Sequence, residues 1–120
     1  MEWDLDKNRA LCPQIYEKIC VSIALGELKP QEKLFSVREA AALAGVNPNT
    51  VQRSFEALER DGVLYSVRSS GWFVSEDISV AAGILEGIIE KRLSEFFSDM
   101  SSFGLSEEEI KQKVKEHFYE

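Results

Sequence analysis

The sequence predicts a mainly α-helical fold with one small β-hairpin, and three observations support it. Apolar residues recur at helical spacing in segments separated by glycine or proline. Residues 63–74 instead carry β-branched and aromatic residues on both sides of a glycine-containing turn, which is typical of a hairpin. From residue 78 onward the helical spacing returns. We therefore expect three helices, a hairpin and a short two-helix tail.

Composition limits the class of protein. The chain has 120 residues, of which 44% are hydrophobic and 29% charged, as in a soluble globular domain with a small appendage. No apolar run approaches the roughly 20 residues of a membrane span, and the acidic N-terminus is not a secretory signal. We therefore expect a cytoplasmic protein with no membrane partner. Cys12 and Cys20 have no CxxC motif or histidine cluster beside them, which favours reduced thiols over a disulfide or metal site.

The net charge of −7 is unevenly distributed along the chain. Residues 1–75 carry 10 acidic and 9 basic side chains, whereas residues 76–120 carry 11 acidic and 5 basic ones. The first part can therefore present a local basic face, whereas the second part would repel phosphates. We expect two domains with these bounds, 1–75 and 76–120.

The first two helices have clear boundaries. Residues 14–25 have apolar side chains at helical spacing, and Gly26 provides a stop. The motif SVRE then places Ser36 three residues before Glu39, which is a capping box and predicts a helix start. Alanines on this second helix allow another helix to cross closely, and Gly45 should end it.

The next helix begins two residues later. Asn47 is a favoured N-cap residue and Pro48 suits the first helical position. Three apolar residues at positions i, i+4 and i+7 should face the core: Val51, Phe55 and Leu58. Four polar residues should point outward: Asn49, Gln52, Arg53 and Glu56. Two helices joined by a short glycine-containing turn predict a helix-turn-helix, and the hairpin that follows makes it a winged helix-turn-helix.

The outward residues predict DNA binding. Asn and Gln can pair with adenine, Arg with guanine or phosphate, and Thr with several partners. The alternative is that Asn47 and Thr50 only cap the helix and Arg38 is a solvated charge; for Asn47 capping is favoured. For the set as a whole, beside an arginine near the wing tip, DNA contact is favoured. The candidate DNA-binding residues are Ser36, Arg38, Asn47, Asn49, Thr50, Gln52, Arg53 and Arg68.

The segments PQIYEKICVSIALGELKPQEKL, SVREAAALAGVNPNTVQRSFEALERDGVLY and GWFV resemble the GntR family of bacterial transcription regulators over about residues 13–75. VNPNTV with a short tail is similar to its small YtrA-like branch. The resemblance implies that Arg38 contacts DNA, that Arg53 lies near a phosphate and that Arg68 is the wing residue. It also implies groove-facing positions for Asn47, Asn49, Thr50 and Gln52.

The chain departs from the family pattern at three places. Pro30-Gln31 replaces Pro-Gly, Leu34-Phe35-Ser36 replaces Leu-Pro-Ser, and the wing has Ser69 and Trp72 where the family has glycine and a small polar residue. Serine resists the positive φ that glycine allows, and tryptophan favours packing. We therefore expect a wing held against its own domain, with Arg68 contacting phosphate rather than the depth of the minor groove.

The tail predicts self-association. Two short helices cannot bury its large apolar side chains alone, so we expect a homodimer through Ile84, Leu85, Ile88, Ile89, Leu93, Phe96, Phe97 and Met100. Gly83 and Gly87 either allow two helices to approach or simply weaken this helix. The resemblance also implies a short helical tail used for dimerisation.

The sequence contains no motif that supports an enzymatic function. His117 is the single histidine and lies near the C-terminus, and the sequence has no phosphate loop, metal spacing or nucleophile motif. We expect no cofactor, and any small-molecule effector is unknown. The prediction is a sequence-specific transcriptional regulator, a repressor acting as a homodimer on a pseudo-palindromic operator in double-stranded DNA. The alternative is a winged-helix protein-interaction module without DNA binding, which would lack salt-dependent affinity for DNA.

Overall fold

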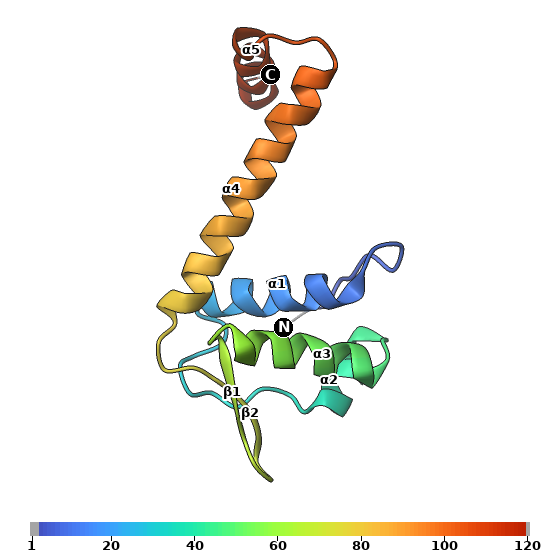
Figure 1. The fold of residues 1–120 in the computed structure, drawn as a ribbon, viewed down its shortest axis with the longest axis vertical. Helices are drawn as coiled ribbons and strands as arrows, with labels where there is room; N and C mark the ends of the chain where they lie inside the picture. The colour runs from blue at the N-terminus through green and yellow to red at the C-terminus, as the bar shows by residue number, and fades with distance from the viewer. Residues whose placement is uncertain (1–2, 120) are drawn as a thin grey trace. The chain divides into compact units, whose positions relative to one another are not determined.

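The computed structural model describes residues 3–119, which form five helices and a two-stranded antiparallel sheet (Figure 1). In chain order the elements are α1 (Leu11–Ala24), α2 (Val37–Ala44), α3 (Pro48–Arg60), β1 (Leu64–Val67), β2 (Gly71–Val74), α4 (Ser79–Ser102) and α5 (Glu107–Tyr119). This order confirms the predicted fold class. Within these described residues, no helix has the length and apolar character that crossing a bilayer requires.

The chain divides into two compact units, Met1–Leu85 and Glu86–Glu120. The division lies ten residues beyond the expected boundary at 75/76. The physical reason is the first part of α4, where Ala81 is 1% exposed and belongs to the winged-helix core. Val80 and Ile84 pack against the same core. The winged-helix unit therefore includes the start of α4.

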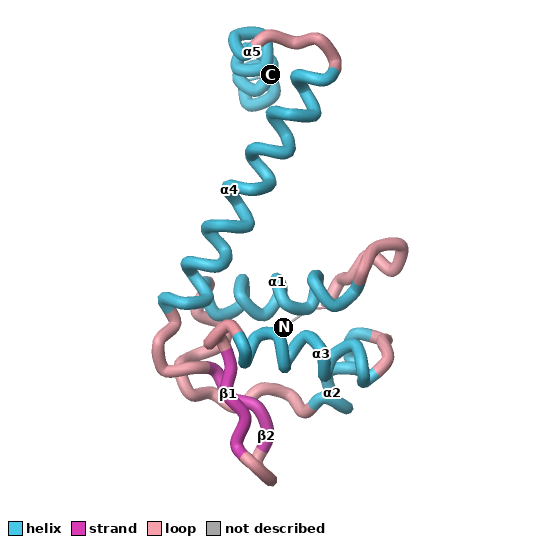
Figure 2. Tube along the Cα trace, viewed as in Figure 1, coloured by secondary structure: helices cyan, strands magenta, loops and turns pink. Residues whose placement is uncertain are grey.

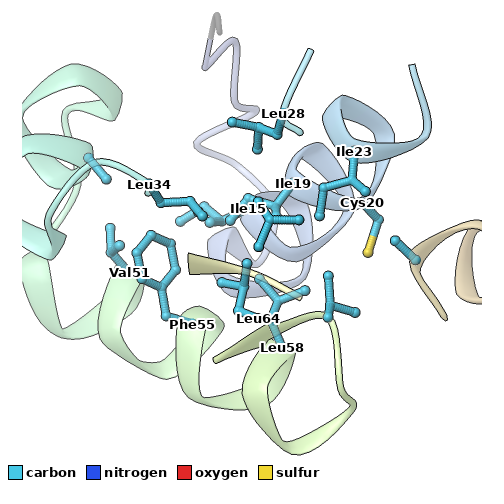
Figure 3. Packing of buried hydrophobic residues seen from close by; sticks show 14 of the residues in the cluster. Ile15, Ile19, Cys20, Ile23, Leu28, Leu34, Val51, Phe55, Leu58 and Leu64 are labelled. Atoms are coloured by element: carbon cyan, nitrogen blue, oxygen red, sulfur yellow. The ribbon is translucent and has the colours of Figure 1, made fainter. Parts of the chain in front are cut away.

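The core of the first unit lies between α1 and α3 (Figure 3). Ile15, Ile19 and Ile23 of α1 are buried, as the helical spacing predicted. From α3 the fully buried residues are Val51, Phe55, Leu58 and Ser54. Ser54 is the polar member, and its hydroxyl donates to the carbonyl oxygen of Cys12 at 2.9 Å. The outward face of α3 is thereby fixed, because the inward face is held on α1.

The two helices of the helix-turn-helix have the predicted ends. Ser36 caps α2, and the Ser36–Glu39 capping box is present. Gly45 follows α2 with φ of 68°, a left-handed conformation that favours glycine. The side chain of Asn47 then accepts from the Asn49 amide at 2.8 Å, with Pro48 in the first helical position. Local chemistry therefore sets where α3 begins.

The β-hairpin is tied to the loop between α1 and α2. Its register pairs Leu64 with Val74 and Val67 with Gly71. The loop adds a bridge between Lys33 and Phe73, and the Leu34 amide donates to the Trp72 carbonyl at 2.8 Å. The two strands, magenta in Figure 2, project away from the helices of their unit, with the turn farthest out. The base of the wing is thus anchored, whereas its tip extends.

A segment before α1 completes the first unit. Leu5 is buried in the core and Trp3 packs against it. The Lys7 ammonium donates to the carbonyl oxygens of Ala44 and Gly45 at 2.9 and 2.8 Å. Because these carbonyls end α2, the lysine satisfies acceptors that the helix itself leaves unpaired and places a cation at the negative end of its dipole.

The second unit contains the end of α4 and all of α5. α4 has 24 residues and carries the apolar residues expected at helical spacing from residue 78 onward. A capping box of Ser106 and Glu109 starts α5, as predicted. Among residues 3–119, a Cβ added at Gly83 or Gly87 would meet nothing within 4 Å. Packing within this part of the chain therefore requires neither glycine.

Candidate nucleic-acid interface

The first turns of α3 present a polar surface to solvent. Asn47, Asn49 and Arg53 are exposed, whereas Thr50 and Gln52 are half-buried. Their positions follow from the opposite face, where Val51 and Phe55 are fully buried. Amides, a hydroxyl and a guanidinium gathered on one helix end match the donors and acceptors that base edges and phosphates present.

The start of α2 contributes two further candidates. The Ser36 hydroxyl accepts from the Glu39 amide at 3.1 Å, so its main role in the folded chain is to cap the helix. Hydrogen bonds from the Ser36 backbone and side chain keep the pKa of Glu39 below its usual value. Arg38 is exposed on the same turn. The capped helix end thus holds Arg38 at the surface, where it can bind a phosphate or a base.

Gln52 is held by a neighbour on its own helix. Its Nε2 donates to Oε1 of Glu56 at 2.8 Å. Both residues lie on the solvent side of α3, with Glu56 one turn further along and exposed. The amide predicted to contact a base is therefore oriented before any DNA arrives.

The wing keeps its tight turn without the family glycine. The Ser70 amide donates to the Val67 carbonyl at 2.9 Å and closes the turn, in which Arg68 and Ser69 are exposed. Ser69 has φ of 69°, the left-handed conformation that we expected serine to resist. Gln31, at the other position where the family has glycine, has φ of 65°. Both residues therefore adopt the left-handed conformation that glycine allows without strain.

Trp72 packs as predicted. Its ring meets that of Phe55 edge to face, with centroids 5.6 Å apart. On the other side of the hairpin, Tyr65 and Phe73 stack at 5.5 Å. Beside Gly71, the Lys33 side chain is so close that a Cβ there would lie 3.4 Å from Lys33 Cε. These contacts fix the base of the wing on the α3 side of the domain.

Two contacts that connect α3 or the turn before it to other parts of the chain were not predicted from the sequence. Lys7 holds the turn between α2 and α3 from 37 residues away, and no local pattern marks such a contact. Glu59 accepts from both the amide and the hydroxyl of Ser66, at 2.8 and 2.7 Å, and so joins the end of α3 to β1. Both contacts hold α3 relative to its neighbours.

Comparison with known proteins supports the same assignment. The model of the "Bacterial regulatory proteins, gntR family" matches residues 11–74. The uncharacterised HTH-type transcriptional regulator YhcF of Bacillus subtilis is 31% identical over 115 residues, covering 96% of this chain and 95% of that protein. The HTH-type transcriptional repressor YtrA of the same organism is 32% identical over 106 residues, covering 86% and 78%. The resemblance to the YtrA-like branch is thus confirmed.

Solved structures show the same fold. A GntR family transcriptional regulator from Listeria monocytogenes superposes with a TM-score of 0.77 and 37% identity, covering 93% of this chain and 98% of that one. The AraR DNA-binding domain, solved in complex with operator ORX1, covers 62% of this chain and 92% of its own, with a TM-score of 0.54 and 28% identity. The chain belongs to the gntR family of bacterial regulatory proteins and is a DNA-binding transcriptional regulator.

Proposed function

We propose that the protein is a repressor that binds a pseudo-palindromic operator as a homodimer, with α3 in the major groove. The observation that carries the proposal is that the first half of α3 presents polar side chains to solvent, while the apolar side chains on its opposite face are fully buried. The relatives YtrA and NagR are named transcriptional repressors, and the AraR domain was solved on operator DNA. A repressor acts by occupying such a site.

The proposed contacts divide into two kinds. Asn49, Thr50 and Gln52 offer hydrogen bonds that can distinguish base edges, whereas Arg53 and Arg68 supply charge for phosphates. Arg38 can serve either kind. Asn47 and Ser36 act through their caps, which set the position of the helix ends.

The second unit supports dimerisation. Between α4 and α5 lies an apolar groove of about 510 Å3. Its lining includes Leu93, Phe96 and Phe97, which are 40–47% exposed although large and apolar, and also Met100. A second copy of the same groove can cover these side chains by two-fold symmetry, which an unpartnered monomer cannot. Of the other residues expected at the dimer interface, Ile89 is exposed, and three are half-buried: Ile84, Leu85 and Ile88.

The test is DNA binding by the full chain on duplexes covering its own promoter region. Affinity should fall steeply with salt, because several phosphates are neutralised. Gln52→Ala should reduce the binding free energy on the preferred duplex by about 1–3 kcal/mol and reduce discrimination between bases at one position. Arg53→Ala is the comparison, because loss of a phosphate contact should weaken all duplexes alike. Binding that is insensitive to salt would favour the protein-interaction module instead.

A further inference from the structure

We propose that Glu56 is a positioning residue that fixes the orientation in which the Gln52 amide presents its donor and its acceptor to a base. The inference rests on the proposed base contact by α3 and adds a residue to it. Its starting point is the 2.8 Å hydrogen bond from Gln52 Nε2 to Glu56 Oε1 on the solvent side of the recognition helix.

The chemistry of the two groups makes this bond directional. An amide has a donor end and an acceptor end of nearly the same shape, so a free glutamine can present either order to a partner. An ionised carboxylate has acceptors but no donor. Glu56 therefore attracts the NH2 of Gln52 and repels its carbonyl oxygen, and one of the two amide orientations is strongly favoured.

The orientation matters because bases are distinguished by the order of donors and acceptors. Adenine presents N7 as an acceptor beside the N6 donor, whereas guanine presents two acceptors. The Gln52 NH2 has two hydrogens, so one can remain on Glu56 while the other, together with Oε1, faces the base. The pair thus presents a fixed donor and acceptor with a free hydrogen-bonding edge, which suits adenine.

The geometry also lowers the loss of side-chain freedom on binding. Gln52 is half-buried and already bonded, so part of its rotamer freedom is lost before DNA binds. Glu56 itself is exposed and its side chain lies on the helix surface, so changing it leaves the buried face of α3 intact. Variants at position 56 are therefore expected to fold.

Three substitutions separate orientation from simple charge. Glu56→Ala removes the partner. Glu56→Gln keeps a hydrogen bond but allows either order, because its own amide can donate or accept. Glu56→Asp keeps a carboxylate at i+4, a spacing at which glutamine and aspartate bond on a helix. Glu76→Gln is the matched control, because it makes the same charge change at an exposed site outside α3.

The experiment uses the full chain and a duplex selected by it from random-sequence DNA. Dissociation constants are measured on this duplex and on its single-base-pair variants, and the Gln52 position is the one whose preference Gln52→Ala removes. The wild-type preference there should be about 5- to 150-fold. Glu56→Ala and Glu56→Gln should lower it at least about threefold, whereas Glu56→Asp and Glu76→Gln should retain it. Adding Glu56→Ala to Gln52→Ala should lower it no further.

Three other outcomes have distinct meanings. If Glu56→Ala and Glu56→Gln tighten all duplexes alike and leave the preference unchanged, Glu56 acts as a repulsive charge and the inference is wrong. If Gln52→Ala removes no preference while the wild type still selects a consensus, Gln52 contacts no base and the inference fails although the proposed function stands. If the wild type selects no consensus, the proposed sequence-specific function fails, and the inference with it.

Discussion

Two non-glycine residues, Gln31 and Ser69, have the positive φ that glycine adopts without strain. Gln31 lies in a turn bonded to the hairpin, and Ser69 lies in the turn of the hairpin itself. The Gln31 amide donates to the Val74 carbonyl oxygen at 2.8 Å, and Ser69 precedes the Ser70 amide that closes the wing turn. The surrounding hydrogen bonds therefore hold each residue in a conformation that its own side chain opposes. This backbone strain should lower the free energy of unfolding by a measurable amount.

We predict that Gln31→Gly and Ser69→Gly each leave the protein equally stable or raise its free energy of unfolding by up to about 1 kcal/mol. The gain comes from relief of the left-handed strain, offset by the greater freedom of glycine in the unfolded chain. Urea unfolding measures it. Ser70→Gly is the matched control in the same turn, because Ser70 is not among the positive-φ residues, and it should be neutral or destabilising. A clear loss of stability in Ser69→Gly would show that the serine is not strained.

Stability should also depend on pH through one hydrogen bond between α1 and the end of α3. The Tyr16 hydroxyl donates to Asp61 Oδ2 at 2.7 Å. This bond is the main cause that lowers the pKa of Asp61 below its ordinary value. A lowered carboxyl pKa stabilises the fold above its ordinary pKa of about 4, and this contribution is lost as the pH falls through the folded-state value.

We therefore predict that Tyr16→Phe lowers the free energy of unfolding by about 0.5–1 kcal/mol at pH 7, since Tyr16 is half-buried but Asp61 is exposed. The difference between the two proteins should shrink as the pH is lowered below about 4. Urea titrations at several pH values measure this. A difference that stays constant down to pH 2 would mean that Asp61 ionisation plays no part.

At the scale of elements, the hairpin is the feature whose role depends most on its anchoring. Its base is bonded to residues 31–34 and packed on Phe55 through Trp72, whereas Arg68 is exposed in the turn. An anchored base limits how far the tip can bend toward DNA. This supports the expectation that Arg68 meets a phosphate instead of entering the minor groove.

Under this view Arg68→Ala should weaken binding to all duplexes about equally and lower the salt slope by about one. Arg68→Lys is the matched control, because it keeps the charge and should keep the slope. Affinities at several salt concentrations, on selected and random DNA, provide the measurement. A loss of discrimination at one A·T-rich position with unchanged non-specific binding would instead place the arginine in the minor groove.

The sequence predicted those elements whose signals are local. The capping box at Ser36, the N-cap at Asn47 and the stop at Gly45 each depend on neighbours within four residues, and all three are confirmed. The wing's attachment was predicted only in part. Trp72 was expected to pack, but the hydrogen bond from the Leu34 amide to its carbonyl oxygen joins residues 38 apart. The spacing of apolar residues in the sequence does not predict such a long-range bond. The Gln52–Glu56 bond has helical spacing and could have been predicted, although glutamine has many alternative partners.

At the scale of the whole molecule, the apolar groove of the second unit sets the expected assembly. Its lining of leucine, methionine and phenylalanine leaves a large hydrophobic surface in water unless another chain covers it. The DNA-binding unit and the tail are separate compact units, so a substitution in the tail can leave the winged-helix unit folded. A dimer would bind two half-sites at once. When one subunit is bound to its half-site, the effective concentration of the second subunit at the other half-site is raised.

We predict that Phe96→Asp disrupts the proposed dimer, leaves a folded monomer and weakens operator binding at least about tenfold, because one α3 helix then binds alone. Phe103→Asp is the control. Phe103 is 76% exposed but is not part of the groove lining, so its replacement should leave the dimer intact. Sedimentation at micromolar concentration measures the assembly. A wild-type chain that sediments as a folded monomer would rule out this mode of association.

Lys7 has a consequence for how the helix-turn-helix resists proteolysis. Its ammonium is occupied by the carbonyl oxygens of Ala44 and Gly45, yet it is also the kind of residue after which trypsin cuts. Cleavage there requires the segment to leave the turn, which is a local opening rather than global unfolding. The rate of clipping after Lys7 therefore reports how often the turn before the recognition helix is released, and bound DNA that stabilises this turn should slow the cut.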